Sequence, residues 1–230
     1  MPLTIAAASS LADILPRLAA LARLSTPPRF VFAASGTLAR QIAAGAPFDV
    51  FVAAGEKETD ELAKSGAIDP ASRAVFAGNR LVTVQNADFN SVIAFNDLAA
   101  PGQTYRVAVG NPDTVPAGRY TKQTLLKRGV WTGLLAGHRL VFTASVREAA
   151  SAAATGNVRL ALVFATDARA DKRLRVTDAA VPGRDHLPIR YVAAVTKEAR
   201  DPNAARTFVR FLASAPARTA LLGAGFTAPE

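Results

Sequence analysis

The sequence contains no cysteine and only two histidines, His138 and His186. The absence of cysteine excludes disulfides, thiolate metal sites and thiol nucleophiles, and it fits an oxidising or a reducing compartment equally well. Two histidines that lie far apart in the sequence supply too few ligands for an ordinary metal site. We therefore expect both to be surface residues, and we expect neither a metal centre nor a cofactor.

The chain also lacks any uncharged apolar run of about eighteen residues, so we expect it not to be embedded in a membrane. Met1 and Pro2 lead directly into an apolar stretch, which leaves no room for a secretory signal peptide. We therefore expect that any export signal has been removed or never existed. No nucleophile elbow, Walker A loop or dinucleotide-binding fingerprint occurs. At 230 residues the chain can form one large or two modest domains.

Acidic residues are outnumbered by basic ones, 18 against 27, and the isoelectric point is about 10.6. Such a balance raises nucleic acid as a partner. The basic residues are scattered, however, and they are not interleaved with aromatic residues as a base-stacking surface requires. We therefore expect no nucleic-acid partner, and a basic surface that attracts anions.

What is present is an alternation of short strands and helices. Apolar patterning predicts strands at 3–8, 29–33 and 48–53, with helices at 11–24 and 37–44 between them. This βαβαβ order predicts a parallel sheet with right-handed crossovers.

The same alternation continues toward the C-terminus. Helices are expected at 56–65, 116–128, 202–214 and 216–223, and strands at 80–84, 106–109, 140–143, 160–164, 174–177 and 191–196. The predicted fold class is α/β with two lobes, each a mostly parallel sheet flanked by helices, joined by a hinge of two crossing segments. Lobe one is expected to hold residues 1–79 and 196–230, and lobe two residues 80–195.

Four helix starts directly follow predicted strands. They are Ser10, Ser35–Thr37, Pro116–Gly118 and Ser145–Glu148. A helix N-terminus carries free amides and about half a positive charge, and it therefore binds anions. Glycines in two of these starts would let the backbone approach a ligand closely. Serine before a helix is also ordinary capping, and Ser145 with Glu148 has the spacing of a capping box.

Longer blocks carry a family resemblance. They read AAASSL, ASGTLARQIAAGAPFDVFVAA, GNRLVTV, VAVGNPDTVPAGRYTKQTLLKRGVW, SVREAASAAATG and LALVFATDA, in this order through most of the chain. In these blocks the sequence resembles the molybdate-binding proteins of bacterial ABC transporters. The resemblance implies a two-lobed periplasmic-binding-protein fold that holds molybdate or tungstate in a cleft and delivers it to a transporter permease. It also implies a periplasmic, monomeric protein that is not an enzyme.

The oxyanion contacts that the resemblance implies fall on Ser10, Ser35, Ala117, Val146 and Phe164. The serines would offer hydroxyls and amides, and Ala117 and Val146 would offer amides. The family commonly has tyrosine at the position of Phe164, and a phenylalanine ring has no donor. Loss of one donor to a buried anion would weaken binding about ten- to hundredfold.

Some questions stay open at the level of sequence. Thr166 or a water could replace the missing phenol, or the site could prefer another oxyanion. The protein could instead be a sensor or binding protein for a different small anion, sulfate-like or organic, or an enzyme on a similar scaffold. A fully deprotonated dianion needs only donors, so Asp113 and Asp167, which lie near two contact stretches, would argue against it if they faced the ligand.

Overall fold

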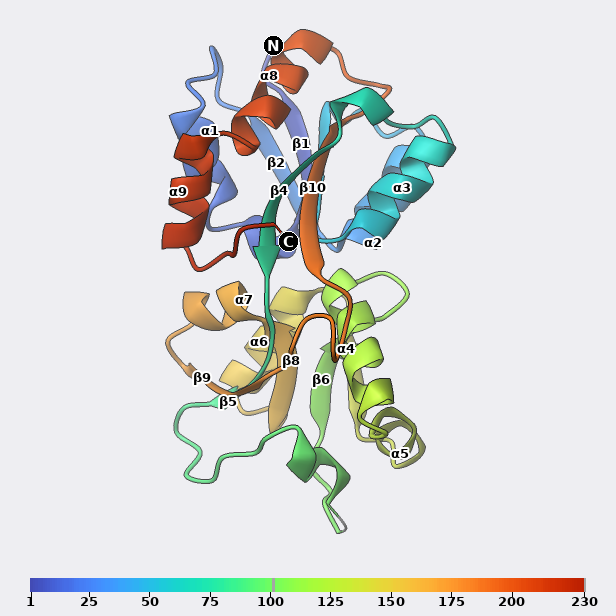
Figure 1. Cartoon of the computed structure of the whole chain (residues 1–230), viewed down its shortest axis with the longest axis vertical. Helices are drawn as coiled ribbons and strands as arrows, with labels where there is room; N and C mark the ends of the chain where they lie inside the picture. The colour runs from blue at the N-terminus through green and yellow to red at the C-terminus, as the bar shows by residue number, and fades with distance from the viewer. Residues whose placement is uncertain (101, 230) are drawn as a thin grey trace. The chain divides into compact units, whose positions relative to one another are not determined.

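A computed structural model describes residues 1–100 and 102–229 of the chain. These residues form two units: the first combines Met1–Gly78 with the C-terminal segment that begins at Ile189, and the second is Asn79–Pro188. The described residues contain two five-stranded sheets, one in each unit, flanked by helices (Figure 1). The predicted α/β fold class is therefore confirmed. Within the described ranges, no helix is long and apolar enough to cross a bilayer.

The sheet of the first unit has the strand order β2-β1-β3-β10-β4. Its strands are β1 (Thr4–Ala8), β2 (Arg29–Ala33), β3 (Val50–Ala53), β4 (Ala74–Asn79) and β10 (Ile189–Val195). The helices are α1 (Leu15–Leu21), α2 (Ser35–Ala43), α3 (Glu56–Lys64), α8 (Pro202–Leu212) and α9 (Ala215–Gly223). Strand β1 pairs in parallel with both β2 and β3, as the βαβαβ order predicts.

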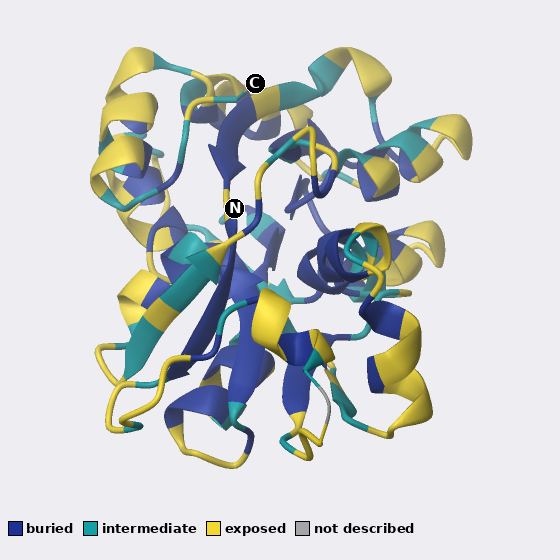
Figure 2. Ribbon diagram, turned by 60° about the horizontal axis from the view of Figure 1, so that its bottom comes forward, coloured by how far each residue is buried: buried dark blue, intermediate teal, exposed yellow. Residues whose placement is uncertain are grey.

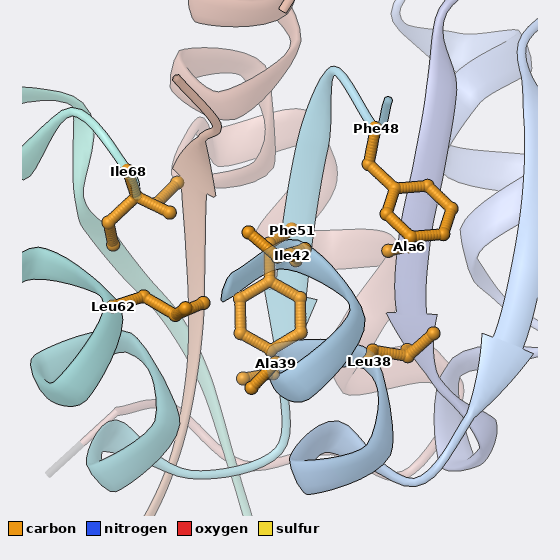
Figure 3. Close-up of a cluster of buried hydrophobic side chains, with 10 residues drawn as sticks. Ala6, Leu38, Ala39, Ile42, Phe48, Phe51, Leu62 and Ile68 are labelled. Atoms are coloured by element: carbon orange, nitrogen blue, oxygen red, sulfur yellow. The ribbon is translucent and has the colours of Figure 1, made fainter. Parts of the chain in front are cut away.

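One core cluster of the first unit lies between this sheet and the helices α2 and α3. Figure 3 shows Leu38, Ala39 and Ile42 of α2 and Leu62 of α3 grouped around Phe51 of β3. Leu38 and Ala39 lie four and three positions before Ile42, so α2 turns one apolar face to the strands, and α3 adds Leu62. The cluster fixes α2, and with it the start of α2, against the sheet.

The boundary between the units lies before strand β10, whereas the sequence pattern predicts it after this strand. The predicted division assigns residues up to 195 to lobe two. In the structure β10 pairs antiparallel with β3, with Val192 opposite Ala53 and Val195 opposite Val50. The backbone hydrogen bonds of β10 thus belong to the first sheet, and the second unit ends at Pro188.

Strand β4 is absent from the sequence prediction because Gly78 and Asn79 resemble a turn. Gly78 instead exchanges two backbone hydrogen bonds with Thr227, at 2.8 and 3.0 Å. A Cβ at Gly78 would overlap the Oγ1 of Thr227. The glycine therefore permits the close approach of another backbone segment within a strand.

Helix α1 is shorter than the predicted helix at 11–24. Residues Ser9–Leu11 form a short 3₁₀ helix, and α1 begins only at Leu15. Pro16 lies in the first turn of α1, where its missing amide costs nothing. A continuous helix from residue 11 would place Pro16 at a position where a backbone amide must donate a hydrogen bond. The proline therefore delays the start of α1 to Leu15.

The second unit has the strand order β7-β6-β8-β5-β9. Its strands are β5 (Leu81–Asn86), β6 (Val107–Gly110), β7 (Leu140–Thr143), β8 (Leu160–Phe164) and β9 (Leu174–Ala179). Its helices are α4 (Pro116–Lys127), α5 (Trp131–Ala136), α6 (Val146–Ala154) and α7 (Ala165–Ala170). Strand β6 pairs in parallel with β7 and β8, whereas β5 runs antiparallel to β8 and β9.

Burial follows the layers of each unit. In Figure 2 the central strands are dark blue, while the helices have one buried and one exposed side. Strand β9 lies at an edge of its sheet and is only partly buried. Trp131 is buried in α5, a helix that the sequence pattern does not predict.

Asp49 joins three segments of the first unit. Its carboxylate accepts hydrogen bonds from the Thr4 amide (2.6 Å), the Arg200 amide (2.8 Å) and the Arg200 guanidinium (2.9 Å). Burial alone would raise the pKa of Asp49, but the bonds from Arg200 and Thr4 outweigh it and hold this pKa below its usual value. Asp49 thus binds two backbone amides and one guanidinium group.

Replacement of this carboxylate should change the acid sensitivity of the fold. Because the pKa of Asp49 is lower in the folded state, its contribution to the unfolding free energy is present above about pH 4 and is lost as the pH falls below that. We expect Asp49→Asn to lower the unfolding free energy at pH 7 by about 1–3 kcal/mol and to flatten its decline in acid.

Urea unfolding at several pH values would measure both effects. Asp88→Asn, at an exposed position, serves as the matched control and should leave both the stability and its pH dependence unchanged. An equally steep acid decline in Asp49→Asn would contradict the role given to Asp49.

Candidate functional site

Ser35 is the first residue of α2, and its side chain does not cap that helix. The residue before it, Ala34, provides no side-chain cap, and the Oγ of Ser35 accepts a hydrogen bond from the Ala54 amide at 3.1 Å instead. Ser35 is fully buried. A hydroxyl that accepts from an amide keeps its own proton for donation, so Ser35 can act as a donor at this point.

Ser10 lies in the 3₁₀ helix that follows β1. Its Oγ is 2.8 Å from the phenol oxygen of Tyr191, in β10, and both side chains are buried. The alanine before this 3₁₀ helix provides no side-chain cap either. The ordinary capping explanation, which applies to any serine at a helix start, therefore holds for neither serine.

The strand register brings the two serines to equivalent positions. Ala8 of β1 is paired with Ala33 of β2, and each serine follows its paired alanine by two residues. Because the strands are parallel, both chains leave the sheet at the same edge. The first unit thus has two buried serines at equivalent positions after two paired strands. The start of α2, which no side chain caps, lies at the same edge of the sheet.

Three predicted positions of the second unit also follow parallel strands. Ala117 is the second residue of α4, after β6; Val146 is the first residue of α6, after β7; and Phe164 ends β8. Since β6, β7 and β8 run parallel, these three residues share one edge of the second sheet. All three are buried.

The starts of α4 and α6 differ in whether a side chain caps their backbone amides. Pro116, the first residue of α4, has no amide, and Val115 before it provides no side-chain cap, so Ala117 carries the first amide of that helix. At α6 the predicted cap is present, since the Oγ of Ser145 accepts from the Glu148 amide at 3.2 Å. This cap binds the third amide of α6 and leaves that of Val146 to other acceptors.

Phe164 fills the position where the resemblance expects a phenol. Its ring lies 6.4 Å from the ring of Tyr120, measured between centroids. Thr166, a possible substitute donor, accepts a hydrogen bond from the Asn79 side-chain amide at 2.9 Å. The hydroxyl proton of Thr166 therefore stays available for donation, as that of Ser35 does.

The acidic residues near these stretches do not add an uncompensated charge. Asp167 is buried, and its Oδ1 lies 2.6 Å from the Nε of Arg147. Asp113 is exposed. Among the described residues, no group of three or more histidine, cysteine or acidic side chains could hold a metal ion. Of the predicted contact positions, Ser10, Ser35, Ala117 and Val146 thus present neutral donors.

His186 contradicts the expectation that both histidines are surface residues. It is buried, its Nδ1 lies 2.6 Å from the Leu187 carbonyl oxygen, and its ring meets that of Tyr120 edge-on. Neighbouring Asp185 pairs with Arg128 at 2.8 Å and is buried as well. The prolines and charges of the loop around His186 suggest that it is exposed to solvent. Contacts with Tyr120 and Arg128, in α4 and at its end, bury it instead.

Gly118 also has a different role from the one its sequence position suggests. A Cβ on Gly118 would overlap the carbonyl oxygen of Gly110, at the end of β6. The glycine permits helix α4 to pack directly on the strand that precedes it, and the close approach is to protein backbone rather than to a ligand. It therefore positions Ala117 indirectly.

A surface hollow of about 270 Å³ lies elsewhere in the second unit. It is lined by Asn111, Pro112, Asp113, Lys122, Trp131, Leu135 and Phe142. Lys122 lies over the Trp131 ring, 5.5 Å from its centroid. The hollow contains none of the five predicted contact residues.

Comparison with known proteins decides the family. The sequence model of a family described as bacterial extracellular solute-binding protein matches residues 3–227. The chain belongs to this family. The family of solute-binding proteins predicted from the sequence blocks is therefore confirmed.

Among individual proteins, the chain is similar to several molybdate-binding proteins. The molybdate-binding protein ModA of Escherichia coli (strain K12) is 36% identical over 203 residues, covering 85% of this chain and 76% of that protein. ModA of Haemophilus influenzae is 32% identical over 231 residues, with 98% and 89% covered. The solved periplasmic molybdate-binding protein of Azotobacter vinelandii superimposes with a TM-score of 0.86 at 27% identity, covering 99% of this chain and 100% of that one.

The contact between Gly118 and Gly110 predicts a sharp response to one added methyl group. Gly118→Ala should lower the unfolding free energy by about 1–3 kcal/mol, because α4 must move away from β6 to admit the Cβ. Thermal or urea denaturation would measure the loss.

Gly133→Ala provides the matched control. Gly133 lies inside α5, and a Cβ there meets no atom within 4 Å. This substitution should stabilise slightly, by up to about 1 kcal/mol, since alanine favours the helix over glycine. Equal stability of the two variants would show that the α4 start is not held by the glycine contact.

Proposed function

We propose that this protein captures a tetrahedral oxyanion, molybdate or tungstate, and delivers it unchanged to an ABC transporter permease. The donor chemistry at the predicted contact positions carries the proposal. Ser10 and Ser35 are buried hydroxyls that cap no helix, and Ala117 and Val146 carry amides at helix starts. The ModA relatives from two bacteria support the choice of ligand.

A fully deprotonated dianion suits this donor set. Such an anion has only acceptor oxygens, so each hydroxyl or amide that faces it gains a hydrogen bond without competition from an acceptor. Ser35 is the clearest case, because its Oγ already accepts from Ala54 and its proton is left to donate. Asp167, a buried carboxylate three residues after Phe164, is neutralised by Arg147.

The proposal also covers where the protein works and with what. Binding by neutral donors and release to a permease require no covalent step, in keeping with a family of solute-binding proteins. We place the protein in the periplasm by analogy with the solved Azotobacter vinelandii protein, which is described as periplasmic. We also treat it as a monomer. These relatives favour capture and delivery over a sensor or an enzyme.

Titration of the purified protein tests the proposal directly. Calorimetry with molybdate, tungstate, chromate, sulfate and phosphate should show saturable binding, strongest for molybdate and tungstate. Folded protein that binds no oxyanion would refute the proposal, and tighter binding of sulfate than of molybdate would refute the choice of ligand.

Ser35→Ala should weaken molybdate binding about ten- to hundredfold, because it removes one donor to a buried anion. The substitution also leaves the Ala54 amide without its acceptor, so affinity should be compared at a temperature where circular dichroism shows the variant folded.

Ser65→Ala is the matched control for Ser35→Ala. Ser65 also lies in the first unit, but its hydroxyl donates to the Leu62 carbonyl at the end of α3. Its replacement should leave the affinity for molybdate unchanged. If Ser35→Ala bound molybdate as tightly as this control, Ser35 would be only a structural partner of Ala54.

Phe164→Tyr restores the phenol that the family commonly has at this position. It should tighten molybdate binding by about tenfold, the value of one further hydrogen bond to a charged group. Phe142→Tyr, at an exposed phenylalanine of β7, controls for an added hydroxyl and should have no effect. No change or a loss of affinity in Phe164→Tyr would mean that the site is built around phenylalanine.

A further inference from the structure

We infer that Tyr191 is a positioning residue that sets the direction of the Ser10 hydroxyl, so that the site favours fully deprotonated dianions over oxyanions that carry a proton. The inference rests on the proposed role of Ser10 as an oxyanion donor. It assigns a function to a buried tyrosine that lies outside all the sequence blocks that carry the family resemblance.

The contact itself joins residues that are distant in sequence. The phenol oxygen of Tyr191 lies 2.8 Å from Ser10 Oγ, across 181 positions of the chain, and both residues belong to the first unit. Tyr191 is fully buried, in the strand next to β3. A buried phenol needs a hydrogen-bond partner, and this geometry makes the Ser10 hydroxyl one of its partners.

The ring of Tyr191 is held on two sides. Phe76 of β4 meets it edge-on with centroids 6.2 Å apart, and Phe226 meets it edge-on at 5.3 Å. Edge-to-face contacts of this kind fix the orientation of an aromatic ring. The phenol oxygen is therefore a preorganised point beside Ser10, and binding need not pay the entropy of ordering it.

The direction of the hydrogen bond decides what Ser10 can offer a ligand. If the phenol donates to Ser10 Oγ, the serine proton is free to donate to an anion. If the serine donates to the phenol, only lone pairs of Ser10 remain, and these repel an anion. The phenol is the more acidic of the two hydroxyls and hence the better donor, and a bound anion favours the same direction. Each bond in such a chain strengthens the next.

This arrangement discriminates by protonation. A fully deprotonated dianion accepts from Ser10 and needs nothing in return. Hydrogen phosphate carries a proton of its own and requires an acceptor, whereas a Ser10 hydroxyl that accepts from the phenol turns its own proton, and not its remaining lone pair, toward the ligand. Without the phenol, the Ser10 hydroxyl can rotate to donate or to accept. The loss of the Tyr191 hydroxyl should therefore weaken dianion binding and reduce discrimination against phosphate.

Tyr191→Phe removes the hydroxyl and keeps the ring between its two aromatic neighbours. We expect the affinity for molybdate to fall about tenfold, while the affinity for phosphate at pH 6, where it carries at least one proton, stays the same or rises. Calorimetry gives both affinities, and their ratio is a readout that a purely structural role would not move. Tyr105→Phe, which loses a phenol bonded to the Asp97 carbonyl in the second unit, is the matched control and should preserve both affinities.

A double-mutant cycle with Ser10→Ala separates action through Ser10 from any other route. If Tyr191 works through Ser10, the change Tyr191→Phe should alter molybdate affinity by less than about twofold when Ser10 is already alanine. An undiminished tenfold loss in that background, or wild-type affinities and selectivity in Tyr191→Phe alone, would overturn the inference.

The wild-type titration keeps this failure distinct from failure of the proposed function. If the wild-type protein binds molybdate and Tyr191→Phe binds it with unchanged selectivity, only the inference about Tyr191 is wrong. If the folded wild-type protein binds no oxyanion, the proposed function is wrong, and the inference falls with it.

Discussion

A helix that begins without a side-chain cap leaves backbone amides in need of an acceptor, and burial makes that need costly. Helices α2 and α4 both begin behind an apolar residue, Ala34 and Val115, that cannot supply one. The serine at the start of α2 is turned toward the Ala54 amide and does not serve its own helix. An oxyanion bound at either start would supply an acceptor for these amides.

Parallel pairing makes the convergence of such starts possible. Strands β1 and β2 deliver Ser10 and Ser35 to the same edge of one sheet, and β6, β7 and β8 do the same for the contact positions of the second unit. Antiparallel neighbours would send successive turns to opposite edges. The central strands are short and buried, which fits sheets covered by helices. The positions of the donors thus follow from topology before any side chain is considered.

Local patterns predicted a large part of this architecture. The strands at 29–33, 140–143 and 160–164 coincide with the observed ones, because each is a short apolar run bounded by clear turn residues. The capping box at Ser145 was also visible, because its two members are three residues apart. Signals of this kind are contained within a few neighbouring residues.

Other features depend on contacts that no local pattern contains. The partner of Ser10 is 181 positions away, His186 is covered by Tyr120 from another element, and β4 owes its glycine to Thr227. The family resemblance supplied the five predicted contact positions, yet it gave no indication of Tyr191, which lies outside the recognised blocks. The contacts of a residue near the N-terminus, such as Ser10, therefore depend on residues that only the folded chain brings close to it.

The contact between Gly118 and Gly110 bears on how this kind of site can diversify. Backbone packs on backbone at the start of α4. Position 118 therefore has no room for any side chain larger than that of glycine, whichever ligand the protein binds. The proposed binding surface is more readily adjusted at positions that already carry a side chain, such as Phe164. A phenylalanine there, where the resemblance expects a tyrosine, is a change of this accessible kind. Such a change alters the donors that the protein offers to a ligand and leaves the backbone at the start of α4 in place.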